Sequence, residues 1–171
     1  FSLDDKAKLN LLHQAKAEGL ESLIVTSTCN RTEIYGFAQH PFQLIKLLCE
    51  NSQGTVEDFQ KVAFVYKNHE AISHMFRVGT GLDSQILGDF EIISQLKNAF
   101  IQSKEFGLAN SFLERLVNSV IQASKKIKTD TDISSGATSV SFSAVRYIFN
   151  NVADISNKNI LLFGTGKIGR N

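Results

Sequence analysis

The sequence of 171 residues contains one proline, two cysteines, one methionine and no tryptophan. Its two cysteines, Cys29 and Cys49, form neither a disulfide framework nor a zinc-ligand spacing, which favours a reducing compartment. No apolar run approaches the roughly 20 residues that a membrane helix needs. A formal net charge of +1 excludes a general attraction to nucleic acid or anionic lipid. These scarcities predict a cytoplasmic protein that has no membrane segment.

The composition, 43% hydrophobic and 20% charged, is that of an ordinary globular protein with one domain, or one domain plus a fragment. Three- and four-residue apolar spacing predicts helices over residues 2–18, 41–50, 70–78, 89–106, 111–128 and 139–151. Ser2 is the expected cap of the first helix, and Gly19 is its expected stop. β-branched and aromatic runs predict strands over residues 22–28, 33–38, 61–66 and 159–163.

The order of the first five elements is helix, strand, strand, helix, strand. One further strand before Phe1 gives the βαββαβ order of a ferredoxin-like sheet, so the predicted class is α+β, with several helices after the sheet. We expect three parts: a first domain over residues 1–138, a linking helix over 139–157, and the start of a second domain over 158–171.

The end of the sequence changes in character. The apolar run at 159–163 (NILLF) leads directly into GTGKIG, which places Gly164, Gly166 and Gly169 in the G-x-G-x-x-G spacing. After a strand, this spacing is typical of a Rossmann dinucleotide site, where glycines let the backbone approach a pyrophosphate. The printed sequence stops before the acid that binds the ribose, so it contains only part of such a site.

A cluster of polar residues, TSTCNRTE, separates the apolar segments 23–25 and 34–37 of the two expected strands. Small polar residues in such a connection are commonly solvated chain. However, a cation beside a cysteine favours the nucleophilic thiolate, and Arg31 lies two residues from Cys29. A guanidinium is also suited to binding a carboxylate with two hydrogen bonds. Cys49 lies on the apolar face of a predicted helix and is expected to be a small buried hydrophobic residue.

The segment STCNRTEIY, residues 27–35, resembles the signature of glutamyl-tRNA reductase. Three other segments resemble blocks of that family in the family's order: HMFRV with GLDS and Gly88, GATSVSFSA at 136–144, and NILLFGTGKIG at 159–169. One block departs from the usual G-E-x-Q-I pattern, because Asp89 and Glu91 take the places of the acid and the amide. The resemblance covers nearly the whole sequence and identifies residues 1–138 as the catalytic domain.

The resemblance implies that Cys29 attacks the ester of glutamyl-tRNA and that NADPH reduces the resulting thioester to glutamate-1-semialdehyde, the first step of tetrapyrrole synthesis by the C5 pathway. By the same likeness, Arg31 is expected to bind the γ-carboxylate of the substrate, and His74 to assist in or near the active site. The remaining substrate-binding residues implied are Thr28, Glu33, Ser84, Ser139 and Ser141. The two serines of the third block also suit plain helix caps, and Glu33 suits either a partner for Arg31 or a solvated carboxylate.

His69 and His74 form H-E-x-x-x-H, which is one residue too long for a zincin motif, and we expect no metal site. The family further implies a homodimer of the full-length protein and an aminomutase partner. Two alternatives of other classes remain: a cysteine-dependent thioesterase or acyl transferase, and a non-catalytic adaptor that contacts RNA. The adaptor rests on Lys125, Lys126 and Lys128, which equally suit a solvated helix end.

Overall fold

The computed structural model describes residues 1–84, 87–89, 91–131, 133, 140–164 and 166, without the side chains of Val140 and Ser141. Its elements follow one another in the order α1 (Asp5–Ala17), β1 (Leu23–Ser27), β2 (Thr32–Gly36), α2 (Pro41–Glu50), α3 (Val56–Val62), α4 (His69–Gly79), α5 (Glu91–Glu105), α6 (Ser111–Asp130) and α7 (Val140–Asn151), with a short 3-10 turn at Ile155–Asn157. The predicted α+β class is confirmed, and so are the first hairpin and the six predicted helices.

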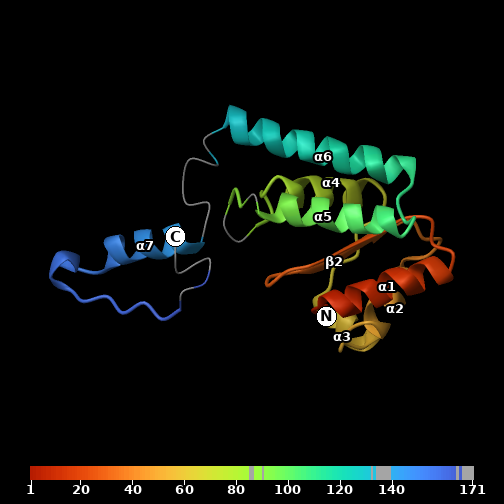
Figure 1. Cartoon of the computed structure of the whole chain (residues 1–171), viewed down its shortest axis with the longest axis horizontal. Coiled ribbons are helices and arrows are strands. Elements are labelled where there is room, and N and C mark those ends of the chain that lie inside the picture. The colour runs from red at the N-terminus through yellow and green to blue at the C-terminus, as the bar shows by residue number, and fades with distance from the viewer. Residues whose placement is uncertain (85–86, 90, 132, 134–139, 165, 167–171) are drawn as a thin grey trace.

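A β-hairpin lies between two layers of helices (Figure 1). One layer contains α1, α2 and α3, and the other contains α4, α5 and α6. Each layer has its own buried core. Leu11, Leu12, Leu47 and Leu48 belong to the first core, and Met75, Leu96, Val117 and Val120 belong to the second. The hairpin is therefore covered by apolar side chains on both faces.

The strands β1 and β2 pair antiparallel, with Leu23 opposite Gly36 and Ser27 opposite Thr32. Successive side chains of a strand point to opposite faces. Accordingly, Leu23 and Val25 pack in the first core, whereas Ile24 packs in the second. The continuous apolar run of β1 is thus explained by burial on both sides of the sheet.

The first helix differs from the prediction at its start. Its N-cap is Asp4, whose carboxylate accepts a hydrogen bond from the Ala7 amide at 2.7 Å, and the expected cap Ser2 lies outside the helix. Asp is as good a cap as Ser, and its charge also suits the positive end of the helix dipole. The predicted stop at Gly19 is confirmed by its left-handed backbone, with φ of 78°.

The strand predicted at 61–66 is wrong. Lys61 and Val62 belong to α3, and residues 63–66 have no regular structure, because no described strand pairs with them. Helix α3 begins with a capping box, in which the Thr55 hydroxyl accepts from the Asp58 amide and the Asp58 carboxylate accepts from the Thr55 amide. The T-x-x-D spacing was the available sign of this helix.

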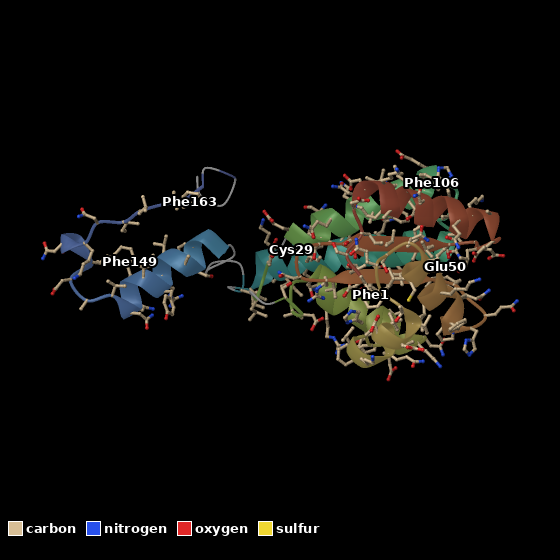
Figure 2. The ribbon with its side chains drawn as sticks, turned by 90° about the horizontal axis from the view of Figure 1, so that it is seen from below. Phe1, Cys29, Glu50, Phe106, Phe149 and Phe163 are labelled. Atoms are coloured by element: carbon tan, nitrogen blue, oxygen red, sulfur yellow. The ribbon has the colours of Figure 1, made fainter. Side chains whose placement is uncertain are left out.

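The strand predicted at 159–163 is also not formed. This segment lacks regular structure, and its apolar side chains are exposed, with Phe163 fully so. A strand needs a neighbour to satisfy its backbone, and no described strand lies beside this one. Helix α7 and the segment that follows it lie apart from the two helical layers in both views (Figures 1 and 2). None of the described helices has the length and apolar character needed to cross a membrane.

Candidate active site at the end of the hairpin

The polar residues between β1 and β2 form a tight, hydrogen-bonded loop. The Thr28 amide donates to the Arg31 carbonyl at 2.8 Å, and the Thr28 hydroxyl accepts from the amides of Asn30 and Arg31 at 3.2 and 3.1 Å. A threonine side chain that bonds its own loop in this way fixes the backbone of the turn. The hydroxyl of Thr28, expected to bind substrate, thus also shapes the loop that presents Cys29.

Cys29 is exposed in this loop, at the end of the hairpin remote from Phe106 (Figure 2). Cys49 is partly buried, packs against the first core, and has a thiol pKa that burial raises. Because the thiolate is the nucleophilic form, the accessible Cys29 is the better nucleophile on geometry.

Arg31 is held by two carboxylates. Its Nη1 lies 3.2 Å from Glu33 Oε1 and 3.2 Å from Asp83 Oδ2, and its Nη2 donates to the Asp83 carbonyl. A guanidinium has five N–H donors. These contacts use three of them, and no described residue pairs with Nε. One edge of the guanidinium, formed by Nε and Nη2, therefore retains two donors for a ligand.

Glu33 links Arg31 to a histidine and a tyrosine. Its Oε1 lies 2.9 Å from His74 Nε2, and its Oε2 accepts the Tyr35 hydroxyl at 2.7 Å. The other nitrogen of His74, Nδ1, is buried without a hydrogen bond and lies 3.8 Å from Asp83 Oδ2. The hairpin and α4 thus bring together two predicted residues, Arg31 and His74, through a shared carboxylate.

The protonation of this group follows from its surroundings. Burial raises the pKa of Glu33, but hydrogen bonds from His74 and Tyr35 and the charges of His74 and Arg31 outweigh burial, so the pKa lies below its ordinary 4.5. Burial and then the adjacent Glu33 carboxylate raise the pKa of Tyr35 far above its ordinary value. At neutral pH Glu33 is therefore ionised and Tyr35 is a neutral donor.

The imidazole of His74 has an aromatic neighbour on two sides. The ring of Tyr66 lies 4.6 Å from it at an interplanar angle of 30°, and the ring of Tyr35 lies 6.3 Å from it at 27°. Such near-parallel contacts hold the plane of the imidazole.

A cavity of about 1350 Å³ opens beside the hairpin. Its lining includes Cys29, Arg31, Glu33, His74 and Asp83, together with β2 and residues 62–67. The volume exceeds the roughly 300–1,000 Å³ of common small-molecule pockets. An exposed thiol, a guanidinium with free donors and an imidazole thus face one solvent-accessible space, which is the arrangement that acyl transfer to sulfur requires.

Other predicted site residues are not gathered there. Ser84 is partly buried but does not line the cavity. Ser139 and Gly169 lie outside the described residues, as does the side chain of Ser141. Gly164 has a φ of 115°, which suits a glycine turn. No strand of the described residues adjoins this glycine segment.

Sequence reasoning gave no role to Tyr35, Asp83 or Tyr66, although all three surround the predicted residues. Tyr35 could have been predicted from the sequence, because it lies two residues after the candidate Glu33, and residues two apart on a strand share a face. Asp83 and Tyr66 could not, because only the tertiary structure brings residues so distant in sequence to the hairpin.

Comparison with known proteins identifies the family of the chain. The family model described as "Glutamyl-tRNAGlu reductase, N-terminal domain" matches residues 1–131. A glutamyl-tRNA reductase of Flavobacterium psychrophilum is 82% identical over 171 residues, which are 100% of this chain and 41% of the relative. One of Aquifex aeolicus is 36% identical over 152 residues, 88% of this chain and 37% of the relative. The chain thus spans about two fifths of the length of these relatives.

The fold has a counterpart among solved structures. Glutamyl-tRNA reductase from Methanopyrus kandleri matches with a TM-score of 0.65 and 26% identity, over 84% of this chain and 34% of that one. The family model covers residues 1–131, and the structural match covers 84% of the chain. The chain therefore belongs to the glutamyl-tRNA reductase family, and its residues 1–131 match the N-terminal domain of that family.

Proposed function

We propose that this chain is the N-terminal part of an enzyme that reduces glutamyl-tRNA to glutamate-1-semialdehyde with NADPH, the first step of tetrapyrrole synthesis by the C5 pathway. The part described here carries the first half of the reaction, which transfers the glutamyl group from tRNA to Cys29. The observation that supports this most directly is the exposed thiol of Cys29 in one cavity with Arg31 and His74.

In the proposed step, the sulfur of Cys29 attacks the ester carbonyl of glutamyl-tRNA. A carbon–sulfur bond forms, the bond to the ribose oxygen breaks, and the thiol proton ends on the released hydroxyl. His74 assists this transfer from the cavity wall. A thioester is a useful intermediate because sulfur conjugates weakly with the carbonyl, which leaves the carbon open to reduction.

The glutamate side chain is proposed to bind Arg31. The ester uses the α-carboxyl group, so the γ-carboxylate is the substrate's remaining anion. The unused edge of the guanidinium offers two parallel donors, and the contacts with Glu33 and Asp83 hold that edge in place. Thr28, Glu33, Ser84, Ser139 and Ser141 remain proposed substrate-binding residues by the family resemblance.

We also propose that the full-length protein completes a ferredoxin-like sheet. A strand before Phe1 would lie between β2 and residues 63–66, where the cavity is wider than a small ligand needs. Ala63 has extended dihedral angles. The rings of Phe64 and Tyr66 lie within 13° of parallel, as expected for side chains two residues apart on one face of a strand. Residues 158–171 are proposed as the start of the NADPH-binding Rossmann domain.

Three further proposals rest on the family alone. The full-length protein is proposed to be a cytoplasmic homodimer that passes its product to an aminomutase. The thioesterase and RNA-adaptor alternatives become outcomes of the experiment below.

The experiment uses the full-length protein with tRNA carrying radiolabelled glutamate, in the absence of NADPH. Without reductant the reaction stops at the thioester, so label should remain on the denatured protein and be released by hydroxylamine. Cys29→Ser should retain no such label, and Cys49→Ser, the matched control, should retain as much as the wild type.

Equal labelling of Cys29→Ser and wild type would remove the nucleophile assignment. Rapid release of free glutamate by wild type with no reduction when NADPH is added would favour the thioesterase. Binding of tRNA without any Cys29-dependent label would favour the adaptor.

A further inference from the structure

The hydroxyl of Tyr35 contacts the carboxylate of Glu33 in the proposed site. Tyr35 lies two residues after Glu33 on β2, so both side chains point to the same face of the hairpin. The Tyr35 ring packs against the second core, and Tyr35 lies opposite Ile24 in the hairpin, which gives the hydroxyl a fixed position. That hydroxyl donates to Glu33 Oε2 at 2.7 Å.

The two oxygens of Glu33 have separate partners. Oε2 accepts from Tyr35, which leaves Oε1 for His74 Nε2 at 2.9 Å and Arg31 Nη1 at 3.2 Å. Without the phenol, Oε2 would be a buried acceptor with no partner, and only the contacts at Oε1 would orient the carboxylate. The hydroxyl of Tyr35 therefore fixes the plane of the carboxylate that faces the imidazole.

The orientation of Glu33 in turn determines the state of His74. An ionised carboxylate only accepts hydrogen bonds, so Nε2 must carry a proton toward Glu33, and whenever the imidazole has a single proton, that proton is on Nε2. Nδ1 then carries the lone pair and faces Asp83 Oδ2 at 3.8 Å. Stacking of Tyr35 and Tyr66 holds the ring plane but cannot choose between the two nitrogens.

We propose that Tyr35 is a positioning residue, whose hydroxyl orients Glu33 and through it fixes the tautomer and orientation of His74. This inference rests on the proposed function for its effect on rate but not for its effect on the tautomer. The same logic, a base held by a third group, recurs in other enzymes that use activated nucleophiles.

The test compares full-length wild type with Tyr35→Phe, which keeps the ring and its stacking and removes only the hydroxyl. Tyr147→Phe is the control, because it removes a phenol hydroxyl from an exposed ring of α7 that does not line the cavity. One readout is the rate of Cys29 acylation by glutamyl-tRNA as a function of pH. The other is the nitrogen NMR signals of His74, assigned by their loss in His74→Asn.

In Tyr35→Phe the rate should fall about tenfold, which is the value of one hydrogen bond to a charged group. The lost donor, together with burial, raises the pKa of Glu33 among its neighbours Arg31, His74 and Asp83. The acidic limb of the pH–rate profile should therefore move to higher pH. The signals of His74 should shift toward a mixture of tautomers, whereas Tyr147→Phe should change none of these quantities by more than about twofold.

A His74 tautomer unchanged in Tyr35→Phe would overturn the proposal, whether or not acylation occurs. A rate loss without any movement of the acidic limb would also overturn it, because a merely structural defect would produce that result. Absence of Cys29 acylation in the wild type would count against the proposed function, and the NMR comparison would still decide the role of Tyr35.

Discussion

At the end of the hairpin, a single guanidinium is held by the protein on one edge and left open on the other. Glu33 and Asp83 together hold Arg31, whose side chain is 22% exposed. Ion pairs on an exposed surface contribute little, but here the carboxylate of Glu33 is only 15% exposed and also bonds His74 and Tyr35. The contacts therefore hold Arg31 in the lining of the cavity.

Replacing Arg31 by lysine should sharply weaken selection for glutamate. An ammonium keeps the charge but cannot offer two parallel donors while also pairing with Glu33 and Asp83. The ratio of acylation efficiencies for glutamyl-tRNA and glutaminyl-tRNA should fall about tenfold or more, as expected for losing a charge-assisted hydrogen bond. It is measured from single-turnover labelling of Cys29 with each tRNA. An unchanged ratio would show that another group reads the γ-carboxylate.

Among the elements, α3 shows how a short helix depends on its ends. It spans seven residues, fewer than an isolated helix needs, and is stabilised by the Thr55–Asp58 capping box and by Phe59. Phe59 is buried in the first core and packs edge-on against Phe1, with ring centroids 5.7 Å apart. Helix α3 thus leads the chain to residues 63–66 at the cavity wall.

Thr55→Ala should loosen α3 without unfolding the domain. The lost cap is worth about 1 kcal/mol, which corresponds to about fivefold faster hydrogen exchange of amides in α3, measured by mass spectrometry or NMR. Thr129→Ala is the control, because its hydroxyl bonds only the Lys125 carbonyl within α6. That control should leave exchange in α3 unchanged. Equal exchange in both variants would mean that packing of Phe59 alone stabilises the helix.

For the whole molecule, the open question is which segment pairs with the outer edge of β2. The Thr28 amide bonds the Arg31 carbonyl and the Phe37 amide bonds the Ser22 carbonyl. Hydrogen-bonded and open pairs alternate in an antiparallel ladder, so the backbones of Ile34 and Gly36 face away from β1. That edge borders the cavity, where unpaired strand backbone invites another strand.

The proposed strand before Phe1 gives a direct expectation. In the full-length protein the amides of Ile34 and Gly36 should exchange at least tenfold more slowly than in the polypeptide of residues 1–171, because pairing removes them from solvent. The amide of Tyr35, which faces β1 in both, is the internal control. Equally fast exchange of Ile34 and Gly36 in both proteins would contradict the completed sheet.

The sequence by itself determined the elements whose partners are close along the chain. Hydrophobic spacing located six helices, and the polar loop between two apolar runs located the hairpin, because local periodicity reflects which face is buried. The motif around Cys29, Arg31 and His74 also identified the family. The cap of the first helix was not determined by the sequence, because Ser2 and Asp4 are both good N-cap residues. The structure shows that Asp4 is the cap.

Tertiary structure decided what depends on distant partners. Residues 61–66 and 159–163 have strand-like composition, but a strand forms only where a neighbour satisfies its backbone, and none is described beside them. Asp83 reaches Arg31, and Tyr66 reaches His74, only because α4 places His74 against Glu33 of the hairpin. Residue types and spacing therefore indicated the chemistry, whereas the contacts that orient its groups arose from packing between elements far apart in sequence.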